Sequence, residues 1–203
     1  MKILKQPIKV IDNFFEAPDV WRHYALKQEF TKDSTSTWPG TRTASLDMLS
    51  MPLFNAFASN LIKHIHDRTF FSLLKVNFAL VDETYNIGWM HQDEPIYNVA
   101  GVVFLNKIVP PNSGLSIYTK IANSSIDFNS IFFEELAADP STRAQFIKFK
   151  LEQRSYFKCN TTVNNFFNRC VLCSPDNFHA ADGYFGSTKE DSRLAITFFG
   201  VAA

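Results

Sequence analysis

An almost continuous apolar run of strand length, from Tyr97 to Asn106, constrains the fold more than any other stretch of this chain. A strand of this kind is buried on both faces, as in the core of a sandwich. From Leu73 onwards the hydrophobic period changes towards two, and further strands are predicted over 74–81, 115–118, 156–163, 169–173 and 192–199. Because no regular alternation of strands and helices appears, the pattern favours an antiparallel sandwich flanked by helices.

Helices are predicted mainly in the first third of the chain, after a first strand over 8–15. Pro18 suits the first turn of a helix that ends at Leu26, and apolar residues at helical spacing predict a longer helix from 52 to 70. A helical insertion over about 128–155 interrupts the strands and could form a lid or side wall; Asp139-Pro140 would break it, and Ser141 could cap its second helix.

These elements predict a single domain over 1–203. Residues 1–72 would supply the first strand and the supporting helices. Residues 73–200 would form a mainly β core, a double-stranded β-helix of the jelly-roll or cupin-like kind.

Three residues have the chemistry and the spacing of a metal site. His91 and Asp93 stand two residues apart, so an extended strand would point both side chains to one face. His179 is the candidate for a third ligand. Two histidines and one carboxylate on one face of a metal leave three positions open, as in non-haem Fe(II) centres. His64 and His66 fall in the predicted helix, where residues two apart do not face each other, and are expected to be solvent-facing or partly buried.

Arginine and tryptophan residues are the next candidates for a site. Arg193 lies in an apolar strand, where a charge needs a partner, and it could bind the far carboxylate of a 2-oxoacid as a bidentate pair. An arginine near a chain end is also often simply solvated. Trp38 and Arg42, in a Ser/Thr-rich loop, and Trp89 are candidates for the rim of a site, although a turn with a solvated Arg42 fits that loop equally well.

Charge and cysteine content bound the class of protein. The 20 basic and 20 acidic residues cancel, so the composition indicates neither a nucleic-acid partner nor a membrane surface. No apolar run approaches the roughly 20 residues of a bilayer span, and no secretory leader is recognisable. Cys159, Cys170 and Cys173 are an odd number, which argues for reduced thiols, and the last two are expected in the core rather than at a metal or redox site. A cytoplasmic protein is therefore predicted.

Four segments and two single residues occur in the order typical of one enzyme family. They are His91-x-Asp93, Leu105-Asn106, residues 113–118 and residues 168–173, followed by His179 and Arg193. In this order they resemble the prolyl-4-hydroxylase-like branch of the Fe(II)/2-oxoglutarate-dependent dioxygenases, over about residues 74–200. Residues 180–186 are in addition similar to a stretch of uncharacterised bacterial members.

The resemblance implies His91, Asp93 and His179 as Fe(II) ligands and catalytic centre. It also implies Arg193 as the salt-bridge partner of the cosubstrate 2-oxoglutarate, with Tyr85 as a further contact.

The chain departs from the family pattern at two positions. Phe104 stands where many members have a tyrosine, so a hydrogen bond to the cosubstrate is lost unless Asn98, on the same strand face, replaces it. Ser113 replaces the first glycine of a Gly-Gly pair, which a turn tolerates.

The resemblance implies O₂-dependent hydroxylation of an unidentified small-molecule or peptide substrate. The 21 phenylalanines leave room for an apolar patch that would form a homodimer. Two alternatives stay open. One is a jelly-roll protein that binds a metal or small molecule without turnover, which Phe104 favours; the other is an interaction module in which the His-x-Asp pair is incidental. The oxygenase needs iron and 2-oxoglutarate together, the binder only the metal, and the module neither.

Overall fold

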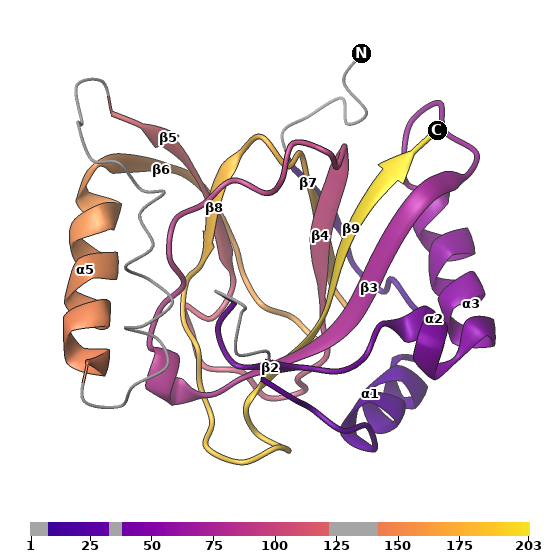
Figure 1. Cartoon of the computed structure of the whole chain (residues 1–203), viewed down its shortest axis with the longest axis horizontal. Coiled ribbons are helices and arrows are strands. Elements are labelled where there is room, and N and C mark those ends of the chain that lie inside the picture. The colour runs from indigo at the N-terminus through magenta and orange to yellow at the C-terminus, as the bar shows by residue number, and fades with distance from the viewer. Residues whose placement is uncertain (1–7, 33–37, 122–141) are drawn as a thin grey trace.

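The structure is a computed structural model that describes residues 8–32, 38–121 and 142–203 (Figure 1). Its elements, in chain order, are β1 Ile8–Ile11, α1 Pro18–Leu26, β2 Thr41–Arg42, α2 Leu46–Leu49, α3 Met51–Ile62, β3 Phe71–Val81, a 3₁₀ turn Glu83–Tyr85, β4 Val99–Phe104, β5 Leu115–Lys120, α5 Arg143–Ser155, β6 Phe157–Val163, β7 Cys170–Cys173, β8 Phe178–Ala181 and β9 Arg193–Ala202. Among these described segments, no helix is both long enough and apolar enough to span a bilayer.

The described strands form two antiparallel sheets. The larger sheet has the order β1-β7-β4-β9-β3-β2, and the smaller sheet has the order β6-β5-β8. Side chains from both sheets meet in one apolar cluster, to which β4 contributes Val102 and Phe104, β5 contributes Leu115 and Ile117, and β6 contributes Val163. In Figure 1 the smaller sheet lies to the left of β4, β9 and β3. The predicted antiparallel jelly-roll fold is confirmed.

The long pair of β3 and β9 sets the positions of the residues that matter below. The register runs from Phe71 opposite Ala202 to Val81 opposite Arg193. β4 joins β9 on its other side, and β2 joins β3 at the edge of the sheet. Arg193, at the start of β9, is thus held two strands away from β2.

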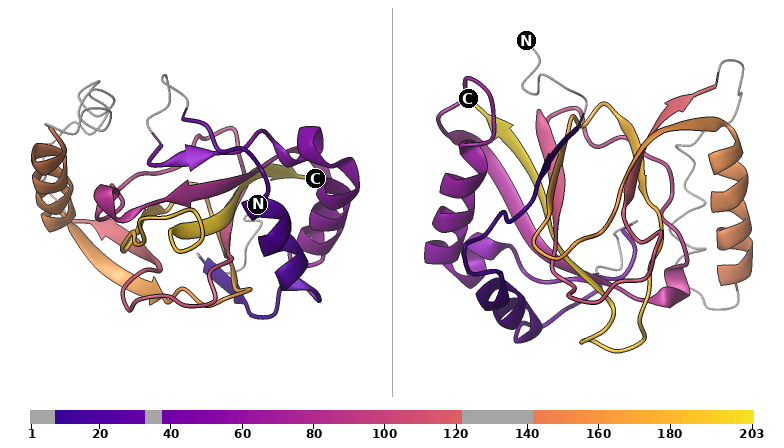
Figure 2. Two further views of the ribbon diagram at one scale, coloured as in Figure 1. Left: turned by 90° about the horizontal axis from the view of Figure 1, so that it is seen from below. Right: turned by 180° about the vertical axis from the view of Figure 1, so that it is seen from behind.

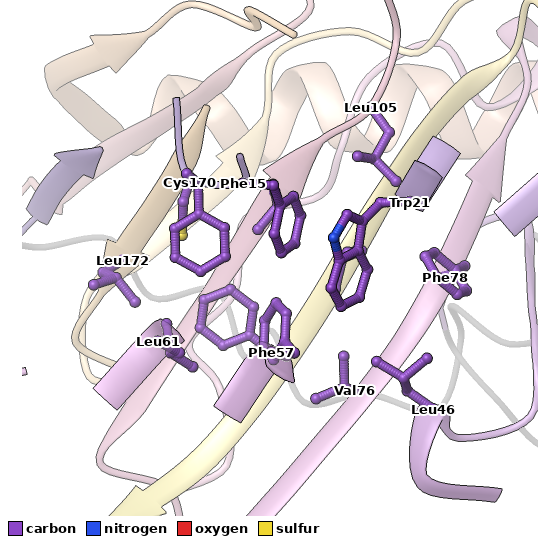
Figure 3. Close-up of a cluster of buried hydrophobic side chains, with 14 of the residues drawn as sticks. Phe15, Trp21, Leu46, Phe57, Leu61, Val76, Phe78, Leu105, Cys170 and Leu172 are labelled. Carbon is purple, nitrogen blue, oxygen red and sulfur yellow. The ribbon is translucent and has the colours of Figure 1, made fainter. Parts of the chain in front are cut away.

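The three N-terminal helices cover the outer face of the larger sheet (Figures 1 and 2). The rings of Phe15 and Trp21 stack with centroids 4.1 Å apart (Figure 3). Phe57 of α3 meets Phe198 of β9 edge-on at 5.4 Å. A fully buried aromatic or aliphatic side chain of this kind contributes roughly 1.5–3 kcal/mol. The helices therefore bury one face of the sheet and leave the opposite face to the space between the sheets.

The predicted helix over 52–70 is wrong at its C-terminal end, since α3 ends at Ile62. Asp67 has a φ of +53°, and the backbone N–H groups of Thr69 and Phe70 donate to the carbonyl of Ala203. The chain thus leaves the helix at Lys63, and its turns lead to the pairing with Ala203. Ile65 misled the prediction because it is buried beyond the helix.

The other histidine pair lies in the turn after α3. His64 is partly buried and His66 is exposed, as expected, although neither is on the helix.

The helical insertion is described only in part. Its second helix is α5, at the edge of the smaller sheet beside β6 (Figure 1). Residues 128–141, with the Asp139-Pro140 break and the Ser141 cap, lie outside the described residues. Strand β8 and the short elements β2 and α2 were not predicted.

The cysteines behave as predicted, with all three thiols free. Cys170 and Cys173 are buried in β7, three residues apart, and so face opposite sides of the strand. Cys170 belongs to the cluster under the helices and Cys173 to the cluster between the sheets. This pair cannot bind one metal ion.

Candidate active site

His91, Asp93 and His179 come together at one end of the space between the sheets. Their ligand atoms all lie within 4.8 Å of one another. The expected strand at His91 and Asp93 is not formed. Both residues lie in an irregular segment with a single bridge. The backbones of His91 and His179 exchange hydrogen bonds of 3.1 and 2.9 Å, and the Asp93 N–H donates to the Pro175 carbonyl. These bonds fix both segments beside each other.

Both imidazoles present the same nitrogen to Asp93. His91 Nδ1 lies 3.1 Å from the Trp89 carbonyl, and His179 Nδ1 lies 2.9 Å from the Asn177 carbonyl. A carbonyl only accepts, so each Nδ1 carries the proton and each Nε2 keeps its lone pair. The two Nε2 atoms lie 3.7 and 3.6 Å from the Asp93 carboxylate oxygens. This is the tautomer that a metal ligand needs.

The carboxylate of Asp93 has no lysine or arginine within 4 Å among the described residues. Its side chain is 2% exposed, and neither oxygen has a hydrogen-bond partner within the described chain. Burial, together with the neighbouring His179, lowers the pKa of His91 to about 3, so its contact with Asp93 is not an ion pair at neutral pH. Burial also raises the pKa of Asp93. A buried carboxylate without partners is costly, and a divalent cation between two neutral imidazoles would offset that cost. The residues present therefore fit a divalent metal.

The three side chains open onto a cavity of about 100 Å³ that reaches solvent. Small residues on the inner face of the larger sheet make room for it, namely Ala79, Gly101 and Ala195. Aromatic rings form much of its wall: Trp89 stacks on His91 at 5.1 Å, and Trp38 meets the same imidazole edge-on at 5.5 Å. Trp38, Arg42 and Trp89 line the cavity, as predicted.

Arg193 lines the same cavity and is 8% exposed. Its guanidinium donates to the carbonyls of Ser113 and Gly114 over 3.3 and 3.4 Å, which are long hydrogen bonds. No carboxylate lies within 4 Å of it among the residues the structure describes. Burial lowers the pKa of Arg193, and Tyr184 and Asp182 oppose that change. The guanidinium therefore retains capacity for an anion in the cavity.

Tyr184 is a site residue that the sequence reasoning missed. It lines the cavity, and the Arg193 guanidinium carbon lies 5.4 Å from the ring centres of both Tyr184 and Phe104. Burial raises the pKa of Tyr184, so its hydroxyl stays protonated and can donate. The only signal in the sequence was its place in the 180–186 stretch. Tyr85 packs edge-on against Tyr184 at 6.4 Å, and its hydroxyl accepts from Lys32.

Asn98 is a correction, because its side chain has a different partner from the one predicted. Its amide donates to the Ala202 carbonyl (3.0 Å) and accepts from the Ala202 N–H (2.8 Å). Asn98 thus lies at the far end of β9 from Arg193, about nine residues or 30 Å away along the strand. It secures the C-terminal strand and does not reach a cosubstrate at Arg193.

One face of helix α5 carries polar residues that support the loop leading to His91. This role was not predicted from the sequence. Gln153 is fully buried and forms two hydrogen bonds with the Met90 backbone, of 2.7 and 2.8 Å. Lys150 donates to the carbonyls of Tyr85 and Ile87. Arg154 donates to the carbonyls of Gly88 (3.2 Å) and Ala181 (2.6 Å), the second of which follows the His179 segment.

Comparisons with known proteins give a family and a fold. A model of a family of unknown function (DUF6445) matches residues 1–199. No curated protein matches the chain by sequence.

Solved structures match over nearly the whole chain. HygX from Streptomyces hygroscopicus, with nickel, 2-oxoglutarate and hygromycin B bound, is 12% identical, with a TM-score of 0.57 and coverage of 96% of this chain and 83% of that one. A prolyl hydroxylase from Trichoplax adhaerens, in complex with a hypoxia inducible factor peptide fragment, is 13% identical, with a TM-score of 0.55 and coverage of 97% and 84%. A Pseudomonas putida prolyl-4-hydroxylase is 12% identical, with a TM-score of 0.51 and coverage of 98% and 94%. At these identities the likeness shows the fold, which is that of 2-oxoglutarate/Fe(II) oxygenases.

Proposed function

The chain belongs to a family of unknown function (DUF6445), and we propose that it is a non-haem Fe(II)- and 2-oxoglutarate-dependent oxygenase. The observation that carries the proposal is the buried, unpartnered carboxylate of Asp93 between the Nε2 atoms of His91 and His179. The buried guanidinium of Arg193 in the same cavity gives the second half of the argument. The fold shared with structures that hold nickel or iron and 2-oxoglutarate supports it.

His91, Asp93 and His179 would hold Fe(II) on one face and leave the opposite positions to ligands from the cavity. When bound, Fe(II) and 2-oxoglutarate supply the chemistry that uses O₂ to hydroxylate a C–H bond while 2-oxoglutarate becomes succinate and CO₂. The carbonyls of Trp89 and Asn177 keep each Nδ1 protonated, so that each Nε2 faces the metal.

Arg193 would bind the distal carboxylate of 2-oxoglutarate as a bidentate, charge-assisted pair. Tyr184 is the hydroxyl donor next to this guanidinium, and it takes the role that Phe104 cannot fill. Tyr85 would then act by supporting the ring of Tyr184. The rings of Trp38 and Trp89 around His91 would keep bulk water away from the metal.

The proposal extends to the substrate, the partners and the location. The substrate is a small molecule or a peptide, O₂ is the second cosubstrate, and a homodimer and a cytoplasmic location remain our predictions. Of the structures compared, HygX was solved with hygromycin B and the Trichoplax enzyme with a peptide. The three free thiols agree with a reducing compartment.

The test is an anaerobic titration of the protein with Fe(II) and 2-oxoglutarate. We expect the weak visible charge-transfer band of the iron chelate in the wild type. The band should be lost in His91→Ala, which removes a ligand, and in Arg193→Gln, which removes the anchor. His66→Ala is the control, since it removes an exposed histidine outside the cavity. Metal binding without the band would refute the oxygenase and favour a metal-binding protein without turnover, whereas no binding of either would favour an interaction module.

A further inference from the structure

A second guanidinium, that of Arg42, faces the cavity beside the metal ligands. Its Nε is buried and has no hydrogen-bond partner among the residues that the structure describes. The guanidinium carbon lies 4.4 Å from the ring centre of Trp38, and the Arg42 backbone is fixed by two hydrogen bonds of 2.9 and 3.0 Å to Thr31. No carboxylate lies within 4 Å of it in the described ranges. Burial lowers the pKa of Arg42 to about 10, so the side chain is charged at neutral pH.

The sheet register separates Arg42 from Arg193. Arg42 pairs with Ala79 across β2 and β3, and Ala79 pairs with Ala195 across β3 and β9. The two arginines therefore lie two strands apart, about 10 Å across the sheet, with small residues between them. The two guanidinium groups therefore enter the same cavity from different strands of the larger sheet.

Arg42 also lies on the way into the site. It lines the metal cavity and an adjoining hollow of about 290 Å³ that is also lined by Glu94, Lys75 and Tyr97. Glu94 and Lys75 are opposite in charge, and Arg42 and Asp93 are charged side chains that line both spaces. A molecule entering beside His91 would pass Arg42 and Trp38.

The charges of the loaded site point to an anion at this position; this step rests on the proposed function. Asp93 and dianionic 2-oxoglutarate carry three negative charges, which Fe(II) and Arg193 balance. Tyr184 and Asp93 favour the charged form of Arg42, but with the charge of Asp93 taken up by the metal, Arg42 has no carboxylate of its own within 4 Å in the described ranges.

We propose that Arg42 binds the carboxylate of the substrate, and that the substrate is a small carboxylic acid with an apolar or aromatic body. The planar guanidinium, held by its stacking on Trp38, presents its edge to a carboxylate. Trp38, Trp89 and Phe199 line the cavity next to it and would contact the apolar body.

The test compares an acid with its neutral isostere. Phenylacetate and phenylacetamide, and then hexanoate and hexanamide, are titrated by calorimetry into the protein with Zn(II) and 2-oxoglutarate, and again without 2-oxoglutarate. A charge-assisted hydrogen bond corresponds to roughly tenfold or more in affinity, so the acids should bind about tenfold more tightly than the amides. Arg42→Gln should remove that preference and leave the affinity for 2-oxoglutarate within about threefold. Lys107→Gln, an exposed lysine distant in the chain, is the control.

The results separate this proposal from the proposed function. Equal affinity of the wild type for acids and amides would overturn the role of Arg42 without any variant, and so would an acid preference that persists in Arg42→Gln. Loss of 2-oxoglutarate binding in Arg42→Gln would make Arg42 the cosubstrate anchor instead. If 2-oxoglutarate fails to bind at all, the oxygenase is refuted, while an acid preference that depends on Arg42 would still establish a carboxylate site.

Discussion

Replacing Gln153 with alanine should weaken both the fold and the metal site. This side chain provides the hydrogen bonds of two backbone groups that burial cuts off from water. Gln153 is 0% exposed and Met90 is 2% exposed. The amide of Gln153 donates to the Met90 carbonyl and its oxygen accepts from the Met90 N–H. Gln153→Ala leaves both backbone groups buried without partners, at about 1–3 kcal/mol each. The free energy of unfolding should therefore fall by about 2–6 kcal/mol, a large part of the ~5–15 kcal/mol of a typical domain.

The same substitution should reduce metal affinity, since Met90 directly precedes His91. Loss of a group that orients a metal ligand typically costs about 10–100-fold in affinity. Urea unfolding of the metal-free protein measures the first effect, and competition for Zn(II) with a chromogenic chelator measures the second in the folded protein. Glu152→Ala, an exposed neighbour on the same turn of α5, is the control and should change unfolding by less than about 0.5 kcal/mol.

Each half of this reasoning can be refuted separately. A Gln153→Ala protein with the wild-type unfolding midpoint would show that the two hydrogen bonds contribute nothing net. A destabilised variant whose folded form binds Zn(II) like the wild type would show that α5 supports the fold but does not position His91.

Three further predictions concern residues away from the metal. Burial lowers the pKa of Lys150 to about 7, against 10.5 in an exposed lysine. Between these values the unfolded chain binds more protons, so the contribution of this residue to stability rises from pH 7 to pH 10; urea midpoints across that range should rise more in the wild type than in Lys150→Met. Asn98→Ala should lower the free energy of unfolding in urea by about 1–3 kcal/mol and leave the affinity for 2-oxoglutarate unchanged. Weaker binding of 2-oxoglutarate would show that Asn98 contacts the cosubstrate after all. A thiol reagent should titrate Cys159 in the native protein and reach Cys170 and Cys173 only after denaturation, because burial raises the pKa of both buried thiols; three fast thiols would contradict the buried positions.

The three side chains of the candidate metal site could be selected from the sequence although their local backbone could not. His91 and Asp93 lie outside any regular strand, yet their spacing places both side chains on one side of any extended backbone. The donor atoms required for a metal depend on residue type, which the sequence states directly. The non-helical conformation of Thr69 and Phe70 goes instead with pairing to Ala203, a contact across more than 130 residues that local periodicity cannot contain.

Arg193 and Asn98 show where such reasoning stops. Arg193 was selected because a charge in an apolar strand needs a partner, and Asn98 because it shares a strand face with Phe104 and could replace the hydrogen bond lost there. For Arg193 the partner that we propose is an anion in the cavity, whereas the side chain of Asn98 pairs with the Ala202 backbone. A polar residue in a strand indicates that a partner exists but does not say which one. Tyr184 was missed for the complementary reason, since a tyrosine in a loop carries no such demand in the sequence.

Helix α5 explains how the ligands can be positioned before any metal arrives. Its polar residues at 150, 153 and 154 look like a solvent-facing stripe in the sequence, but they contact the backbone on both sides of the site. Gln153 fixes the residue before His91, and Arg154 joins Gly88 to Ala181, which lies two residues after His179. One helix thus ties together two segments that are about 90 residues apart. Hydrogen bonds that form without the metal leave less of the binding free energy to be spent on ordering the site, so metal binding should stabilise this protein by mass action and not be required for it to fold.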